Sequence, residues 1–306
     1  MNASMNATPA VPAPMHATRP MFWSVQRELW ENRSIAIVPL IAAGIMLFGF
    51  LLSTLSLAYN MPALLQLEPV KQHPEFTKPY NISAVFIIVA AFLTGVFYCL
   101  DALYGERRDR SILFWKSLPV SDFTTVLAKA SIPLAVLPIF AFVVIIATQL
   151  VMLVLSSIIM LGNDLSPSIP WAQWPIFRES WVLAYGLVTL ALWHAPVYGW
   201  LLLVSGWAKK STFLWAVLPI MGLSVLERIS FGTAHFYTLM KYRLMGGFEA
   251  AFVMPVRDPT GKHPVPFEAI PDPAHFLGSP AVWIGLVFAV AFLAAAIWMR
   301  RNRDPI

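Results

Sequence analysis

One ionisable residue of this chain, His194, lies deep inside a long apolar run, in the stretch LWHAPVYGW. Burying an ionisable side chain in hydrocarbon is costly, so such a residue is by default a candidate for function. Pro196 has no backbone N–H, which leaves the carbonyl of Leu192 without its helical donor. Two interpretations remain open. Either His194 lines a substrate path, or it is a neutral imidazole hydrogen-bonded to a freed carbonyl on a neighbouring helix.

No catalytic constellation accompanies this histidine. The sequence contains no G-x-x-x-x-G-K-[ST] phosphate loop, no H-E-x-x-H zinc motif and no pair of acids within an apolar run. His263 and His275 lie near each other, but their spacing matches no metal signature. The single cysteine, Cys99, excludes an intramolecular disulfide. We therefore predict no catalytic residue, cofactor or metal in this chain and no enzymatic activity of its own.

The composition places these residues in a membrane protein. The chain has 306 residues, of which 58% are hydrophobic and 12% charged, against roughly 25% charged in soluble domains. Several runs exceed the roughly 18 apolar residues that a membrane-spanning helix needs, and these runs have no polar face. We predict an all-α polytopic membrane protein whose six crossings are residues 35–58, 82–104, 132–161, 181–207, 211–226 and 280–299.

The basic residues predict the orientation of the crossings. They are concentrated before the first crossing, between the second and third, between the fourth and fifth, and after the sixth. Short loops rich in Lys and Arg stay on the cytoplasmic side of a membrane. Both termini are therefore expected in the cytoplasm. The same topology accounts for the net charge of +5, so we expect no nucleic-acid partner.

Two segments precede the first crossing. Residues 1–20 are small, polar and proline-rich, and we expect a disordered tail. Residues 21–34 fit an amphipathic helix lying in the membrane plane, with Arg27, Glu28 and Glu31 opposite its apolar arc. A frayed extension of the first crossing is the alternative. Residues 35–306 then form the six-helix domain.

An external lobe is expected at residues 227–279, because this segment is too long for a simple loop. Its first half has helical spacing of apolar residues up to a break at Gly246 and Gly247. Its second half is interrupted by prolines. We predict a short helical hairpin followed by an irregular segment.

The stretch YGERRDRSILFWKSLPVSDFTTVLAKA, residues 104–130, separates the second and third crossings. The second helix is expected to continue to about Arg110, with Glu106 and Arg110 one turn apart. Residues 110–118 then fit a short transverse helix, and Ser121 fits an N-cap for the third crossing. Lys129 is expected to reach back to the membrane surface.

The apolar residues of this transverse helix surround it instead of forming one stripe. Such a helix is covered either by several helices of its own chain or by a second protein. The residues that raise this question are Ile112, Leu113, Phe114, Trp115 and Leu118.

This stretch resembles the ABC-2 type permeases, the membrane subunits of bacterial exporter-like ABC transporters. The resemblance is most specific at Glu106, Ser111, Leu113, SLPVS at 117–121 and Lys129. Elsewhere it concerns the helix layout between residues 21 and 303, and the N-terminal tail has no counterpart in the family.

The resemblance implies a bacterial inner-membrane location and a separate ATPase subunit, present in two copies, that binds ATP and Mg. It also implies a second copy of this permease or a sister permease. Residues 110–118 would be the coupling helix that docks on the ATPase, and 21–34 the connecting helix. The residues expected at the ATPase contact are Glu106, Arg107, Arg110, Ile112, Phe114, Trp115, Lys116 and Leu118.

By this resemblance the chain would export a substrate or extract it from the bilayer. Its aromatic-rich helices favour a hydrophobic or amphipathic cargo such as a lipid, peptide or drug. An ion-coupled secondary carrier is an alternative, although it would carry internal repeats and several intramembrane acids. An intramembrane enzyme that uses His194 is another, although it needs a nucleophile or carboxylate at the same depth, and the sequence shows none.

Overall fold

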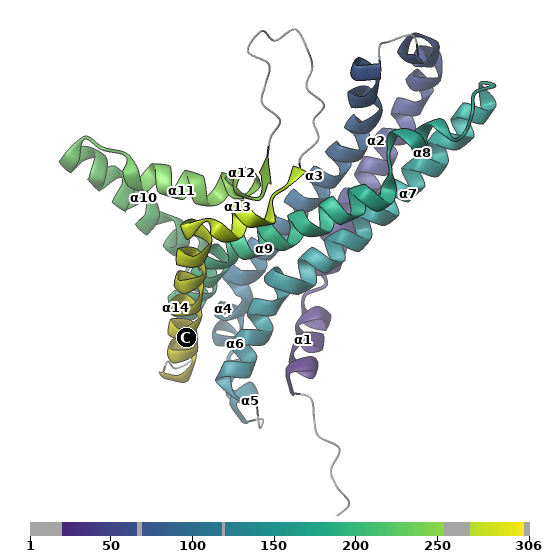
Figure 1. Cartoon of the computed structure of the whole chain (residues 1–306). Coiled ribbons are helices and arrows are strands. Elements are labelled where there is room, and N and C mark those ends of the chain that lie inside the picture. Colours follow the sequence, from purple (N-terminus) through teal and green to yellow (C-terminus); the bar gives the residue numbers. More distant parts are fainter. Residues whose placement is uncertain (1–19, 66–68, 118–119, 254–269, 303–306) are drawn as a thin grey trace, which may run out of the picture.

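The computed structural model describes residues 20–65, 69–117, 120–253 and 270–302, and within them the chain is almost entirely helical (Figure 1). The helices on the N-terminal side are α1 (Pro20–Glu31), α2 (Ser34–Leu65), α3 (Pro69–Ala102), α4 (Tyr104–Arg108), α5 (Ser111–Ser117), α6 (Asp122–Ser131), the π-helix η1 (Ile132–Val136) and α7 (Leu137–Gly162). Those that follow are α8 (Ile169–Gln173), α9 (Ile176–Trp207), α10 (Thr212–Phe231), α11 (His235–Met245), α12 (Gly247–Ala251), α13 (Pro273–Gly278) and α14 (Pro280–Asn302). A two-residue antiparallel pair, β1 (Phe252–Val253) and β2 (Ile270–Pro271), joins the ends of the segment 254–269.

Six helical stretches in the described part of the chain are long and apolar enough to cross a membrane. Each contains most or all of one predicted crossing, which confirms the prediction of an all-α polytopic membrane protein. Several helices continue well beyond their apolar runs, because backbone hydrogen bonds propagate a helix until a turn ends it. The stretches are Ser34–Thr54, Glu75–Arg108, Asp122–Gly162, Ile176–Trp207, Thr212–Phe231 and Pro280–Asn302.

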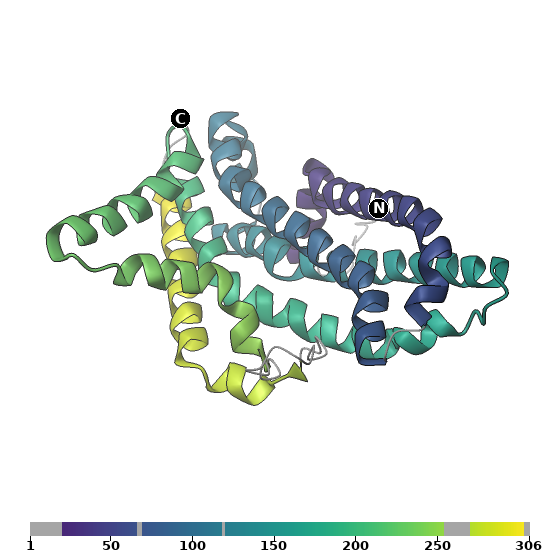
Figure 2. The ribbon, with the colours of Figure 1, turned by 90° about the horizontal axis from the view of Figure 1, so that it is seen from above.

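The centre of the bundle is α9. Of its most apolar stretch 67% is buried, against 6% for α10, so α9 is the most buried of the six spans, with α3, α7, α10 and α14 packed against it. It crosses α14 closely at Gly199, where an added Cβ would lie 3.2 Å from the carbonyl oxygen of Ala289. A view from above shows α14 running across α9 (Figure 2). This crossing fixes the last helix of the chain against the core.

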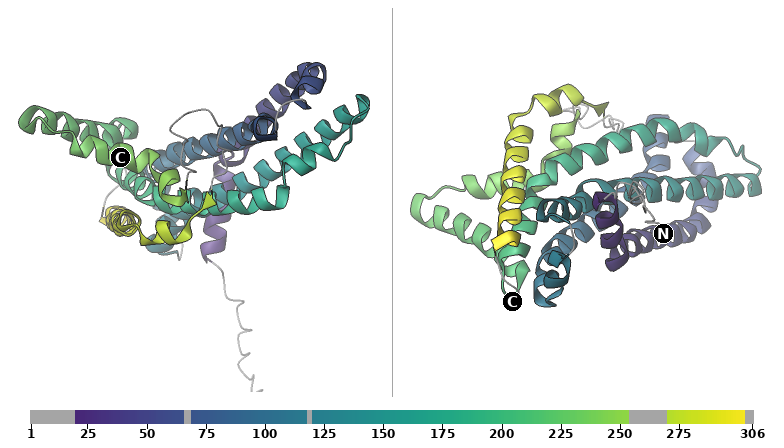
Figure 3. Two further views of the ribbon diagram at one scale, coloured as in Figure 1. Left: turned by 45° about the horizontal axis from the view of Figure 1, so that its top comes forward. Right: turned by 90° about the horizontal axis from the view of Figure 1, so that it is seen from below.

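Helices α10 and α11 form an arm that projects from the bundle (Figures 1 and 3). The chain reverses at Gly232, whose φ of 67° is a left-handed conformation that glycine adopts without steric cost. The arm returns to the core where the Trp193 indole donates a hydrogen bond to the carbonyl of Arg243, 2.8 Å away. The predicted break follows at Gly246, between α11 and α12. Most of the expected irregular segment, 254–269, lies outside the described residues.

Two predictions about the ends of helices have different outcomes. The N-cap at Ser121 is confirmed, because its hydroxyl accepts the backbone N–H of Thr124. The continuation of the second helix is confirmed as far as Arg108, two residues short of the predicted end at about Arg110 and with one interruption at Leu103. Helix α3 ends at Ala102, α4 ends at Arg108, and Arg110 has a positive φ of 58°. The chain therefore bends twice between the second crossing and the transverse helix.

The N-terminal segment is a separate helix. Residues 32 and 33 divide α1 from α2, and the side-chain amide of Asn32 donates to the carbonyl of Glu28 across this turn. The expected disordered tail, up to residue 19, lies outside the described residues. That α1 lies in the plane of a membrane stays a prediction.

Candidate functional site at the end of the bundle

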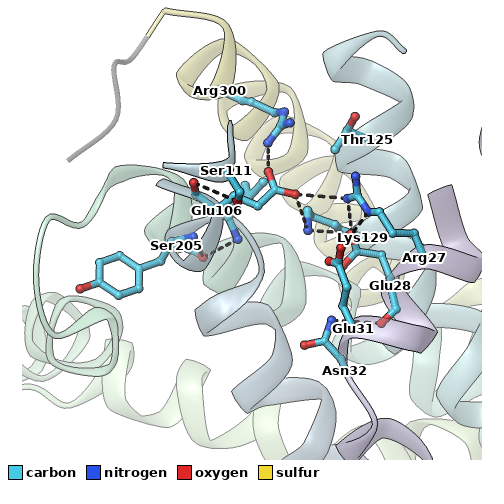
Figure 4. A network of polar contacts seen from close by, with 12 residues as sticks. Arg27, Glu28, Glu31, Asn32, Glu106, Ser111, Thr125, Lys129, Ser205 and Arg300 are labelled. Atoms are coloured by element: carbon cyan, nitrogen blue, oxygen red, sulfur yellow. Dashed lines mark hydrogen bonds and ion pairs between the residues drawn. The ribbon is translucent and has the colours of Figure 1, made fainter. Parts of the chain in front are cut away.

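A cluster of six charged side chains joins four helices at the end of the bundle where α1, α5 and the C-terminal end of α14 lie (Figures 1 and 4). Three are cations and three are acids, so their formal charges balance. We call this set the charge cluster, and its members are Arg27, Glu28, Glu106, Asp122, Lys129 and Arg300.

Glu106, on α4, is the central acid. Its carboxylate is nearly buried and accepts from Arg27 at 3.2 Å and from Lys129 at 3.1 Å. Its second oxygen accepts from Arg300 of α14, whose guanidinium also reaches Asp122 of α6 at 3.0 Å. Arg110, the residue expected to pair with Glu106 one helical turn away, is exposed and does not belong to the charge cluster. One carboxylate thus ties α4 to α1, α6 and α14.

Glu28 is the second buried acid. Lys129 lies 2.8 Å and Arg27 2.6 Å from the same carboxylate oxygen, and the Tyr98 hydroxyl donates to the other at 2.8 Å. Burial by itself raises the pKa of Glu28, but Lys129 and Arg27 outweigh it and hold that pKa below its ordinary value. Glu28 is therefore ionised at neutral pH. It forms the α1 side of the cluster.

Two expectations for these residues are wrong. Lys129 does not reach the surface, because its ammonium is held between two carboxylates and the residue is only 2% exposed. Glu28 does not lie on an exposed polar face, since that face of α1 packs on α6. The apolar residues of α1 are turned outward instead, with Trp23 and Trp30 largely exposed. Helix α1 thus buries Glu28, leaves Glu31 exposed, and exposes most of its apolar side.

The break between α3 and α4 is stabilised by α9. Ser205 is fully buried, and its hydroxyl oxygen accepts the backbone N–H groups of Leu103 at 3.0 Å and Tyr104 at 2.8 Å. Arg107 donates to the carbonyls of Gly206 and Ala208, where α9 ends. A cation at a helix C-terminus satisfies carbonyls that have no helical donor. Helix α4 is therefore fixed to the end of the central helix.

Helix α5 has an anchored side and an exposed side. Ile112 is buried, and Trp115 lies against the Arg27 guanidinium at 4.1 Å from the ring centroid. On the other side, Leu113 and Phe114 are 58% and 61% exposed. Of the remaining expected contact residues, Arg110 and Lys116 are exposed, Glu106 and Arg107 are buried within this chain, and Leu118 lies outside the described residues.

Helix α5 links the span that ends in α4 to the span that begins with α6, and the charge cluster fixes both flanks. The acids of the cluster are each paired with cations, which leaves none positioned as a general base. In the described part of the chain, no three His, Cys, Asp or Glu side chains gather as a metal site would require.

The second predicted site, His194, lies in the membrane-spanning part of α9. Its Nδ1 faces the carbonyl oxygen of Leu190 at 2.9 Å, and its Nε2 faces that of Leu244 on α11 at 3.2 Å. A neutral imidazole has one N–H and can donate to only one of them. The carbonyl of Leu192, freed by Pro196, is not its partner. His194 thus faces a carbonyl oxygen of the neighbouring helix α11 and also lines a cavity between α3, η1, α7 and α9.

Comparisons of the chain with protein families, with curated proteins and with solved structures found no match. The site therefore has to be interpreted from its own geometry. Sequence reasoning missed the contributions of Arg27, Lys129, Arg300 and Ser205. The three basic residues were interpreted as topological charges. A signal was nevertheless present, because Glu28 and Glu106 lie next to apolar runs and a buried acid requires a cation.

Proposed function

We propose that this chain is the membrane subunit of an ATP-driven transporter of the ABC-2 type and that α5 docks on a separate ATPase subunit. The observation that carries the proposal is the two-sided character of α5. A helix of only seven residues presents two large apolar side chains, Leu113 and Phe114, to the outside while its other side is fixed by Ile112 and Trp115. A simple connection between two spans does not require this arrangement.

The exposed pair lies outside the apolar runs of the six spans. Leu113 and Phe114 are at the same end of the bundle as the charge cluster, and exposed cations flank them at Arg110 and Lys116. An apolar centre with a polar rim is the usual composition of a protein–protein interface. A cleft on a second protein that covers these two side chains would remove their apolar surface from water.

The charge cluster supports the same proposal. A docked subunit can move membrane helices only if the element it contacts transmits force without bending. Glu106 joins α4 to α1, α6 and α14, and Arg107 joins α4 to the end of α9. A displacement of α5 would therefore pass to the neighbouring helices together.

The remaining parts of the proposal follow from this function. ATP and Mg are bound by the ATPase subunit, which is present in two copies, and a second permease subunit completes the transporter. An even number of crossings puts both ends of the helical domain on one side of the membrane, and we place them in the cytoplasm of a bacterium. The cargo is hydrophobic or amphipathic and is exported across, or extracted from, the inner membrane.

Co-purification tests the proposal. The tagged chain, expressed in its own host and solubilised in mild detergent, is expected to retain an ATPase subunit carrying a phosphate-binding loop. The Phe114→Asp variant should lose that subunit, because a carboxylate would have to be buried without a partner. The matched control is Phe177→Asp, since Phe177 is 90% exposed at the first turn of α9. Retention of the same subunit by Phe114→Asp, or absence of any ATPase from the native chain, would refute the proposal.

A further inference from the structure

A cavity of about 220 Å³ lies within the spanning part of the bundle. Its walls come from α3, η1, α7 and α9, with Leu244 of α11 at one end. The side chains that form it are apolar apart from His194 and Tyr198, and no acid, lysine or arginine is among them. It is a partly open pocket, since Val89 in its wall is 48% exposed. A molecule of one ring with a small substituent is of a size to enter it.

Tyr198 gives this cavity a polar group without a partner. The residue is only 6% exposed, and its ring packs near Phe92, with 6.0 Å between the ring centroids. Within the described residues, its hydroxyl makes no hydrogen bond. A hydroxyl beside an apolar cavity gains from a hydrogen-bond acceptor, because polar groups away from bulk water are stabilised by a partner. A lipid acyl chain in the cavity could not accept its proton, whereas a molecule with a carbonyl or ether oxygen could.

The backbone around the cavity is irregular on one side. Pro133, which lines the cavity, lies in η1, a single π-helical turn, and single π turns occur frequently at functional sites. One wall of the cavity therefore departs from α-helical geometry.

We propose that this cavity is a binding site for an uncharged, mainly apolar molecule that carries one hydrogen-bond acceptor. The apolar lining accommodates the body of the molecule, and Tyr198 donates to its acceptor. His194, whose ring nitrogens face the carbonyl oxygens of Leu190 and Leu244, borders the site next to α11. That the bound molecule is the cargo rests on the proposed transport function, whereas its binding does not.

Two matched probes test the inference on the purified, detergent-solubilised chain. Acetophenone carries a carbonyl oxygen, and α-methylstyrene has a CH₂ group in its place. Equilibrium binding, followed by the stabilisation of the protein against thermal unfolding, should favour acetophenone by about three- to tenfold, the value of one hydrogen bond. Tyr198→Phe removes only the hydroxyl, so it should abolish the preference and reverse it, because the carbonyl of acetophenone would be buried without a donor. Ala191→Leu, which extends a lining side chain into the cavity, should weaken the binding of both probes.

Three results would overturn the inference. Equal affinity of the native chain for the two probes would indicate a purely apolar slot of the kind that lipid chains fill. A preference for acetophenone that persists in Tyr198→Phe would place the donor elsewhere, and unchanged binding in Ala191→Leu would place the probe outside the cavity. Co-purification of the ATPase subunit does not depend on any of these three results. Failure of this inference would therefore leave the proposed function standing, and failure of the proposed function would leave the binding site standing.

Discussion

Replacing Lys129 by methionine should destabilise the fold strongly, although the two side chains have similar volumes. The ammonium of Lys129 lies 2.8 Å from Glu28 and 3.1 Å from Glu106, and the residue is buried. Removing it leaves three acids with two cations in the charge cluster. Breaking a buried ion pair by removing one partner costs about 3–5 kcal/mol. Because Arg27 still contacts both acids and Arg300 still contacts Glu106, we expect a loss near the lower limit, about 3 kcal/mol.

A double-mutant cycle separates the lost ion pair from lost packing. Glu28→Gln removes one acid, so the double variant with Lys129→Met returns to two cations and two acids. The double variant should be more stable than the sum of the two single losses predicts, with a coupling energy of about 1–2 kcal/mol. The free energy of unfolding is measured by denaturant titration of the detergent-solubilised protein.

An exposed lysine provides the control. Lys78 lies 2.8 Å from Glu75, the same distance as in the buried pair, but the two side chains are 61% and 45% exposed. Lys78→Met should therefore cost about 0–1 kcal/mol. If Lys129→Met were no more destabilising than this control, or if the cycle showed no coupling, the charge cluster would not hold these helices together.

Three further predictions concern other features. Ser205→Ala should cost about 1–3 kcal/mol in unfolding free energy, because it leaves two buried backbone N–H groups at the α3–α4 break without their acceptor; Ser205→Thr, which keeps the hydroxyl, should cost less. The stability that Glu28 contributes should be complete above the ordinary glutamate pKa of about 4.3 and should decline as pH falls through the lowered pKa of the folded state. An acid titration of unfolding should show that decline in the native chain and a shallower one in Glu28→Gln. Gly199→Leu should separate α9 from α14, because even a Cβ at this position would lie 3.2 Å from the Ala289 carbonyl oxygen. A pair of cysteines introduced across the two helices should therefore cross-link more slowly in Gly199→Leu than in Gly199→Ala.

Some of the fold can be predicted from local sequence because its causes are local. The six spans follow from the length of the apolar runs. Each span is helical because its backbone groups, in hydrocarbon, must be hydrogen-bonded within the segment. The cap at Ser121 and the short helix after Arg110 also depend on neighbouring residues only. Which apolar side chains of α5 are buried, such as Ile112, and which are exposed, such as Phe114, required the tertiary structure.

The candidate site could not be predicted in the same way, because its contacts join residues far apart in the chain. Glu28 and Lys129 are 101 positions apart, and Glu106 and Arg300 are 194 apart. Periodicity and charge counts place each of these residues on a helix but do not say which helices pack together. From the sequence, the basic residues of the charge cluster were therefore expected at the surface, where they would set the membrane topology.

The sequence by itself determined that this is a helical membrane protein with six crossings and a short helix between the second and third. Only the tertiary structure decided that Lys129 and Glu28 are buried, that the chain breaks at Leu103 between α3 and α4, and that Tyr198 lines a cavity with His194. The reason is physical. Hydropathy is a property of each segment alone, whereas the state of a buried charge or hydroxyl depends on what the packing of other helices brings to it.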